Sequence, residues 1–246
     1  MFDGVQQAFG FLTVCPLRSN APWTPETLGR SMVYYPVVGL GLGLLLWGFA
    51  LLLGLLFPPA VVCVLLLAAS LLLTGGLHSD GLADLIDGLS GSYTREDALR
   101  IFKDPHVGSM AVAGVSLLLL IKYVCLQAVP PTTLGPTLVL MATLSRYAMV
   151  QLACFSLYAR ATGGLGAPFV QGIRHRHFLG ALVVALGIVL WCAGLRGVGI
   201  GCLVGLATLG MQRYARHRLG GITGDVLGAT NELSEALVLL LATLVI

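Results

Sequence analysis

The sequence has few charged side chains: 10% of its 246 residues are Asp, Glu, Lys or Arg. A soluble domain carries about 25%. A chain with so few ionised groups cannot cover a water-facing surface, which excludes an ordinary soluble globular fold. The formal net charge of +3 is small, and neither a basic helix nor a zinc-finger spacing is present. We therefore expect no nucleic-acid partner.

Paired cysteine motifs are also missing. The six cysteines are scattered without a CxxC pair, and five of them lie in or beside apolar runs. We interpret them as small buried hydrophobic residues rather than as disulfides or metal ligands. The N-terminus lacks a basic segment followed by a short apolar core and a cleavage site. We therefore expect no removable signal peptide.

Long apolar runs dominate the sequence instead, since 57% of the residues are hydrophobic. A helix needs roughly 20 such residues to cross the hydrocarbon core of a bilayer. We predict an all-α, polytopic integral membrane bundle that forms a single catalytic domain over residues 1–246, with an interfacial helix before Pro16. About seven transmembrane helices are expected, at approximately 33–57, 59–77, 107–129, 137–158, 178–195, 198–212 and 233–246.

The distribution of charge predicts the topology. Seven spans place the N-terminal segment and residues 78–106, 159–177 and 213–232 on one side. That side holds eleven of the 14 Lys and Arg residues, so the positive-inside bias assigns it to the cytoplasm of a protein in the cell inner membrane. The acidic residues and histidines gather there as well, although the bias does not sort them. This gathering indicates an active site that faces the cytoplasm.

The first polar motif contains Asp80, Asp84 and Asp87, whose spacing of i, i+4 and i+7 forms one stripe of an α-helix. Three like charges on one stripe repel each other, and a bound divalent cation removes that repulsion. Oxygen ligands favour magnesium, which commonly takes one or two carboxylates plus substrate phosphates. The alternative is a solvated helix face with Asp80 as its N-cap. Three aspartates flanked by glycines at a membrane boundary favour the metal.

The second polar motif places Arg100 and Lys103 at i, i+3 beside Asp104. A basic pair next to a carboxylate suits a phosphate group held against a metal ion. The stretch from Arg95 to Arg100 alone fits an ordinary surface helix. The hypothesis of phosphate binding therefore depends mainly on Lys103 and Asp104.

The third polar motif leads into the last span. Asp225 and Glu232 stand seven residues apart and share a helix face, and Glu235 follows one turn later. A glycine-rich backbone at a helix N-terminus is a site for anions, so the turn at Thr223 and Gly224 could bind phosphate; it also fits a plain helix start. Because a carboxylate within a membrane helix is costly, we expect Glu235 to have a function.

Two cations lie within the predicted spans. Arg146 precedes Arg160 by about 14 residues, close to the middle of the bilayer by the helical rise per residue. Such a charge is expected to face a cavity or a partner carboxylate. Lys122 lies nearer the far end of its span, where it can extend to the interface, and no role is assigned to it.

These motifs, in this order, resemble the cobalamin synthase family (adenosylcobinamide-GDP ribazoletransferases) over nearly the whole chain. The chain departs from the family pattern at Ser79, at Leu85 and in the run Asp104-Pro105-His106. The resemblance rests on Gly75-Gly76-Leu77-His78-x-Asp80-Gly-Leu-Ala-Asp84-x-x-Asp87-Gly, Arg95-Glu96…Ala98-Leu99…Lys103-Asp104…Gly108, and Gly220-Gly221-x-Thr223-Gly224-Asp225-x-Leu-Gly228-Ala229…Glu232-Leu-Ser-Glu235, and less specifically on Phe11-Leu12-Thr13…Pro16 and Ser145-Arg146.

The resemblance implies a magnesium-dependent phosphotransferase. The hydroxyl of α-ribazole, or of its 5′-phosphate, attacks the cobinamide-linked phosphorus of adenosylcobinamide-GDP. GMP leaves, and adenosylcobalamin or its 5′-phosphate forms in the last stage of nucleotide loop assembly. The lipid bilayer is the other expected partner. A homo-oligomer and an association with other cobalamin-pathway enzymes both stay open.

Phosphoryl transfer needs charge neutralisation and alignment rather than a covalent nucleophile, and these residue types suit it. The expected metal ligands are Asp80, Asp84, Asp87 and Asp225. The expected catalytic residues are Asp84, Asp87 and Lys103. The expected substrate-binding residues are His78, Arg100, Asp104, Arg146, Thr223, Gly224, Glu232 and Glu235.

Two other functions compete with this prediction. A secondary transporter would also have many helices and a charge such as Arg146 in the membrane, but it would spread polar groups along a transmembrane path. A membrane phosphotransferase for another nucleotide-diphosphate-linked alcohol would use similar aspartates. Its motif carries an Ala-Arg pair after the first Asp-Gly, where this chain has Leu82-Ala83-Asp84.

Overall fold

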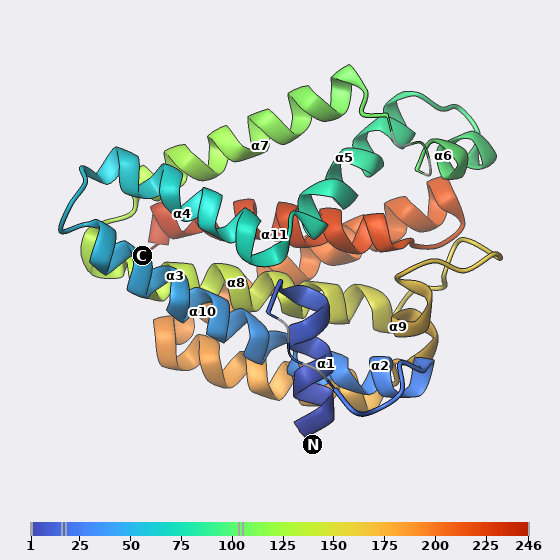
Figure 1. Ribbon diagram of the computed structural model, residues 1–246, viewed down its shortest axis with the longest axis horizontal. Helices are drawn as coiled ribbons and strands as arrows, with labels where there is room; N and C mark the ends of the chain where they lie inside the picture. Colours follow the sequence, from blue (N-terminus) through green and yellow to red (C-terminus); the bar gives the residue numbers. More distant parts are fainter. Residues whose placement is uncertain (1, 16, 18, 103, 105, 246) are drawn as a thin grey trace.

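The structure, a computed structural model, describes residues 2–15, 17, 19–102, 104 and 106–245. This part of the chain is helical, and its β pairing consists of one isolated bridge between Tyr158 and Ile222. Most of the helices run along a common long axis (Figure 1). The prediction of an all-α bundle is confirmed.

The long apolar helices account for most of the predicted spans. Five helical stretches within the described residues are long and apolar enough to cross a membrane, and a bent helix pair is a sixth candidate. The five are Pro25–Leu53 (α2, Pro25–Ser31; η1, Met32–Tyr34; α3, Tyr35–Leu53), α7 (Ser109–Ala128), α8 (Pro131–Cys154), α10 (His175–Leu219) and α11 (Gly224–Val245). The pair is α4 (Pro59–Thr74) and α5 (Leu77–Ser90), which meet at 91°.

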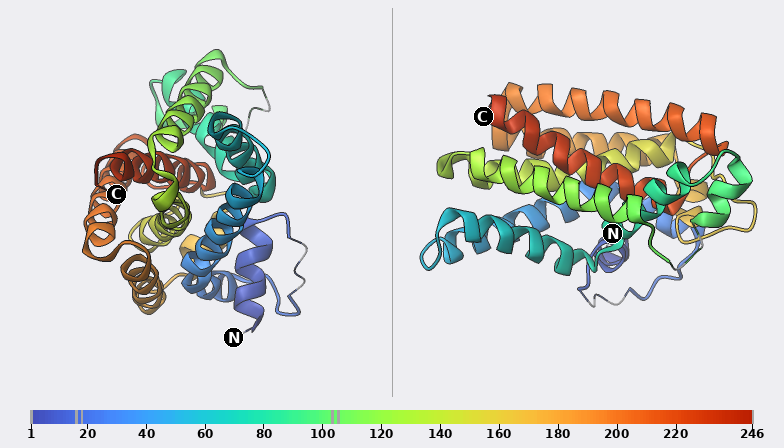
Figure 2. Two further views of the ribbon diagram at one scale, coloured as in Figure 1. Left: turned by 90° about the vertical axis from the view of Figure 1, so that its left-hand side faces the viewer. Right: turned by 90° about the horizontal axis from the view of Figure 1, so that it is seen from above.

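The helix α10 contains two of the predicted spans. Its backbone is interrupted at Gly194, whose φ of 55° and ψ of −141° lie outside the helical region. Glycine adopts positive φ without the steric cost that other residues meet. The chain reverses there, and the second arm of α10 returns along the bundle (Figures 1 and 2). With the two arms counted separately, the apolar helices agree with the predicted number of about seven spans.

The polar segments gather at one end of the bundle. The helices α6 (Arg95–Ile101) and α9 (Ala167–Gly172) lie at that end, and α5 leads toward it from its 91° bend with α4 (Figure 1). Because α5 carries three aspartates, we assign α4 to the bilayer and α5 to the rim outside it. The helix expected before Pro16 is α1 (Phe2–Leu12).

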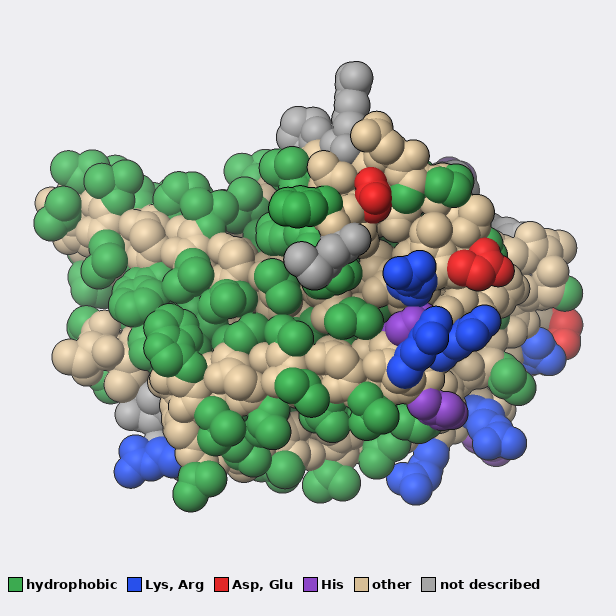
Figure 3. Space-filling model, turned by 90° about the horizontal axis from the view of Figure 1, so that it is seen from below, with side chains coloured by type: hydrophobic (Ala, Val, Ile, Leu, Met, Phe, Trp, Pro, Cys, Tyr) green, Lys and Arg blue, Asp and Glu red, His purple; other side chains and the backbone are tan. Residues whose placement is uncertain are grey.

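The surface and the centre of the bundle follow the same division. Figure 3 shows apolar side chains over most of one face, with charged and histidine side chains gathered mainly toward one end. The central helix is α8, in which every residue from Thr137 to Ala153 is buried. It places Arg146 inside the protein rather than in lipid.

Candidate active site

Close packing of α5 against α11 brings the first and third polar motifs together. A Cβ atom on Gly81 would lie 3.0 Å from the carbonyl oxygen of Asp225 and 3.3 Å from the Cα of Gly228. The two backbones can approach this closely because both positions are glycine. Residues separated by about 140 positions in the sequence therefore share one site.

Three carboxylates meet at this contact. Asp80 and Asp225 line the same cavity, of about 90 Å³, together with His78, Gly224 and the ring of Phe169. Asp84 lies within the electrostatic reach of both carboxylates, and burial together with the charges of Asp225 and Asp80 raises its pKa to about 6. The predicted meeting of α5 carboxylates with Asp225 is therefore present in the structure.

Asp225 is held by two neighbours. The Thr223 hydroxyl donates to its Oδ2 at 2.9 Å, and Nη2 of Arg160 lies 3.0 Å from the same oxygen. The side chains of Arg160 and Asp225 are 13% and 20% exposed, so water screens this pair less than a surface pair. The Thr223 hydroxyl also accepts a hydrogen bond from the Val226 amide, so Thr223 is the N-cap of α11.

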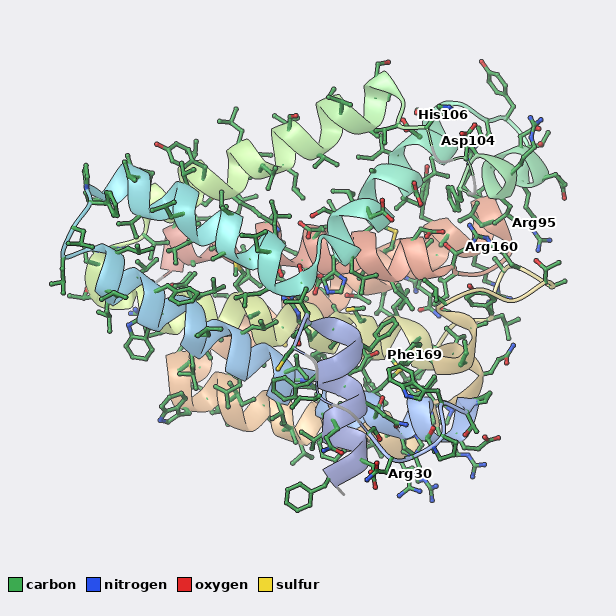
Figure 4. All side chains as sticks on the ribbon, viewed as in Figure 1. Arg30, Arg95, Asp104, His106, Arg160 and Phe169 are labelled. Atoms are coloured by element: carbon green, nitrogen blue, oxygen red, sulfur yellow. The ribbon has the colours of Figure 1, made fainter. Side chains whose placement is uncertain are left out.

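The position of Arg160 depends on a short backbone pairing. The Ala159 amide donates to the Ile222 carbonyl at 2.8 Å, and the Ile222 amide donates to the Leu157 carbonyl at 2.8 Å. Figure 4 shows Arg160 beside Arg95, which donates to the Ala159 carbonyl at 2.9 Å. No local motif in the sequence shows that the partner of Arg160 is Asp225, since 65 residues separate the two.

Asp87 has a different environment from Asp80 and Asp84. Its two carboxylate oxygens accept hydrogen bonds from the amides of Gly108, at 2.5 Å, and Ala111, at 3.0 Å. These amides belong to the start of α7, where free N–H groups favour a negative charge. Asp87 thus joins α5 to α7 through these two hydrogen bonds, while its charge still acts on the neighbouring Asp84.

Asp80, Asp84 and Asp225 are the type of ligand that a hard divalent cation prefers, but their present positions do not form a coordination site. Within the described residues, no three Asp, Glu, His or Cys side chains are grouped as metal ligands. Asp80, Asp84 and Asp225 offer the oxygen donors that magnesium prefers, and their mutual repulsion favours a bound cation. Asp225 is paired with Arg160, so a metal ion would have to compete with this arginine.

A second charged cluster lies deeper in the bundle and corrects the expectation for Lys122. Its Nζ lies 2.6 Å from Glu232 and 2.7 Å from Glu235, and its side chain is 4% exposed. Lys122 therefore does not extend to the interface, because two buried carboxylates hold it inside. Arg146 pairs with Glu235 as well, as expected for a cation in mid-membrane. Ser79 donates to Glu232 at 3.0 Å, which ties α5 to this cluster.

His78 lies between the two clusters. It lines the 90 Å³ cavity and also a smaller cavity, of about 20 Å³, beside Lys122 and Arg146. The side chain is buried, and neither ring nitrogen has a hydrogen-bond partner among the described residues. Among the expected substrate-binding residues, Arg146 pairs with Glu235, and Glu232 and Glu235 pair with Lys122, whereas His78 has no such partner among the described residues.

The described residues of the second polar motif, Arg100 and Asp104, have partners other than the carboxylates of this site. Arg100 pairs with Asp97 at 3.0 Å on the surface, and Lys103 lies outside the described residues. Asp104 contacts the ring and the amide of His106, and the hydrogen bond from this amide is the main cause that lowers the pKa of the Asp104 carboxyl. Figure 4 shows Asp104 and His106 apart from Arg160 and Phe169.

The fold and the acidic cavity define a polytopic membrane protein with a polar site at one end of its helices. The family model for cobalamin-5-phosphate synthase matches residues 4–243. The chain belongs to this family. No solved structure matches it.

Curated relatives resemble the chain over almost its whole length. A protein of Chlorobium phaeobacteroides is 39% identical over 239 residues, which cover 96% of this chain and 95% of the relative. A protein of Geotalea daltonii is 40% identical, with coverage of 95% and 94%. A protein of Syntrophobacter fumaroxidans is 38% identical, with coverage of 97% of both chains. All three are named adenosylcobinamide-GDP ribazoletransferase.

Proposed function

We propose that this protein is an adenosylcobinamide-GDP ribazoletransferase, which joins α-ribazole or its 5′-phosphate to adenosylcobinamide-GDP. The observation that carries the proposal is the meeting of Asp80 and Asp84 from α5 with Asp225 from α11, beside Arg160. Asp80 and Asp225 line one cavity, and the guanidinium group of Arg160 is bonded to Asp225. Neighbouring carboxylates and a guanidinium group suit a magnesium-bound diphosphate. Membership of the family and the names of the relatives support the same activity.

The proposed reaction is a direct displacement at phosphorus. The ribazole hydroxyl oxygen forms a bond to the phosphorus that carries cobinamide, and the bond from this phosphorus to the bridging oxygen of GMP breaks. GMP leaves with the electron pair of that bond, and a carboxylate of the site accepts the proton of the hydroxyl. No serine or cysteine nucleophile is required.

We assign the acidic residues of the site to the metal ion and the basic residue to the phosphate groups. Asp80, Asp84 and Asp225 would hold magnesium, which when bound supplies charge neutralisation for the diphosphate. Arg160, which pairs with Asp225 here, would donate its two parallel N–H groups to a pair of phosphate oxygens if that carboxylate held a metal ion instead. This contribution takes the part expected from Arg100, which pairs with Asp97 on the surface, while the part expected from Lys103 stays a prediction.

We also propose that the site faces the cytoplasm from the cell inner membrane. The polar segments share one end of the bundle (Figure 1), and on the face drawn in Figure 3 the basic side chains lie mainly toward one end. The positive-inside bias places such an end in the cytoplasm.

A reconstituted reaction tests the proposal. Purified protein in detergent is incubated with adenosylcobinamide-GDP, α-ribazole and magnesium, and GMP is measured by chromatography. GMP release should require both magnesium and ribazole, and a chelator should stop it. Turnover in detergent also separates an enzyme from a transporter, which acts only between two compartments.

Two matched variants locate the site. Asp84→Asn should abolish transfer while the protein still inserts and folds, because it removes one charge from the group of carboxylates around Asp225. Asp97→Asn, on the surface helix α6, should keep full activity. Full activity of Asp84→Asn would refute the metal assignment, and absence of GMP release from the unaltered protein would refute the proposed function.

A further inference from the structure

A second and larger cavity lies where α1, α2 and the start of α10 meet. Its volume is about 530 Å³, and none of its lining residues lines the 90 Å³ cavity. We call it the basic cavity, and its lining includes Asp3, Gln7, Thr27, Arg30, Arg176 and His177. Ligand pockets commonly have volumes of about 300–1,000 Å³, so it can accept a small molecule.

Arginine side chains converge on this cavity without carboxylate partners. Arg30 and Arg176 line it, and their charges act together with that of Arg174 on the buried ring of His177. None of these three arginines belongs to an ion pair among the described residues.

The acidic groups near the basic cavity are fewer than the arginines. Asp3 is part of its lining, and Glu26 lies within electrostatic reach of Arg174. Like charges around a cavity repel each other, and a bound anion offsets the repulsion. The balance of charge therefore favours an anionic ligand.

The walls of the basic cavity are fixed by packing and hydrogen bonds. Gln7 is 1% exposed, and its amide nitrogen donates to the Pro22 carbonyl at 3.2 Å. A Cβ atom on Gly4 would lie 2.8 Å from the ring of Tyr34, so α1 packs closely on the helix that follows α2. Arg30 and Arg176 are exposed at this wall, so their planar N–H forks are accessible to the phosphate oxygens of a ligand.

The surroundings of the cavity are those of a membrane interface. The helix α1 runs across the long axis of the bundle rather than along it (Figure 1). Phe2 is 80% exposed and Trp23 is 53% exposed, and aromatic residues of this kind are typical of the headgroup region. Arg30 lies on the same side of the bundle as α1 (Figure 4), and basic and histidine side chains adjoin on this face (Figure 3).

We propose that the basic cavity binds the phosphate group of an anionic phospholipid through Arg30 and Arg176. The chemistry it recognises is a phosphate ester, and the position of α1 assigns the ester to a lipid headgroup. Anionic headgroups are attracted to juxtamembrane arginines, which adds to the specific contacts. The bound lipid would hold α1 against α2 and α10.

Binding of short-chain lipids to the full chain in a neutral detergent tests this proposal. Dioctanoyl-phosphatidylglycerol, dioctanoyl-phosphatidylcholine and inorganic phosphate are titrated separately, and bound lipid is counted by native mass spectrometry. Phosphatidylglycerol should bind at least about tenfold more tightly than either of the others. Loss of two charge-assisted contacts in R30Q/R176Q should weaken phosphatidylglycerol binding by about 10- to 100-fold.

Two further variants separate a built site from general surface charge. R213Q/R216Q removes the same charge from exposed positions on α10 and should bind phosphatidylglycerol as the unaltered protein does. R30K/R176K keeps the charge but loses the planar fork, and should bind with an intermediate affinity. This variant also tests the site if R30Q/R176Q does not fold.

Three outcomes would overturn the proposal. Equal weakening in R213Q/R216Q would show that net charge alone attracts the lipid. Unchanged binding in R30Q/R176Q would place the lipid elsewhere. Binding of inorganic phosphate at least as tight as that of phosphatidylglycerol, lost in R30Q/R176Q, would show a site for soluble phosphate esters rather than lipid.

Discussion

Lys122 and Glu235 lie 113 residues apart in the sequence and form an ion pair of 2.7 Å inside the bundle, where both side chains are 4% exposed. Glu232 and Arg146 complete the cluster, so two cations face two carboxylates. A buried charge in a membrane protein is costly unless a partner compensates it. The balanced cluster therefore joins α7, α8 and α11.

We expect Lys122→Met to destabilise the protein strongly. It leaves Glu232 without its cation and removes one of the two cations of Glu235, and such a loss costs about 3–5 kcal/mol. Thermal unfolding in detergent should show a large fall in the melting temperature. Removing a charge of each sign in K122M/E232Q should recover part of the loss. Equal melting temperatures for Lys122→Met and the exposed-site variant Arg213→Gln would contradict the compensation.

Features of single helices could be predicted from the sequence, whereas contacts between helices could not. Apolar runs predicted the spans, and helical spacing placed Asp80 and Asp84 on one face, because both patterns are properties of single helices. The partners of Lys122 and Arg160 could not be predicted in this way, since both partners lie in α11, more than 60 residues away along the chain. Asp87 fits the spacing of the stripe, but the nearby start of α7 determines its contacts.

We expect Arg160→Gln to have opposite effects on metal binding and turnover. In the absence of substrate, loss of the guanidinium group frees Asp225, so magnesium should bind more tightly. During turnover, loss of a charge-assisted phosphate contact should lower kcat/KM by about 10- to 100-fold. Calorimetric titration with magnesium and GMP-release assays measure the two effects. Arg160→Lys should lose less activity, and a parallel fall in metal binding and turnover would indicate a structural role instead.

Magnesium should stabilise the protein more at pH 7.5 than at pH 5.5. In the folded, metal-free protein the pKa of Asp84 is about 6, above its ordinary value of 3.8. The folded state therefore binds more protons between these values, and its stability falls as pH rises from about 4 to 6. Magnesium needs the ionised carboxylate, so its effect grows over the same range. Thermal-shift measurements should show this difference, and Asp84→Asn should reduce it while Asp97→Asn leaves it unchanged.

The contact between α5 and α11 predicts different results for two glycine substitutions. Gly187 has open space around it, so Gly187→Ala should be neutral or stabilising by up to about 1 kcal/mol through helix propensity. A Cβ on Gly81 would lie 3.0 Å from the carbonyl oxygen of Asp225. Because this neighbour is a backbone atom, the steric overlap cannot be relieved by rotating a side chain. Overpacking costs about 1–3 kcal/mol, so Gly81→Ala should be less stable than Gly187→Ala by that amount. Because the same contact places Asp80 and Asp84 beside Asp225, Gly81→Ala should also weaken magnesium binding. Equal stability and equal magnesium affinity in the two variants would show that the site does not depend on this close approach.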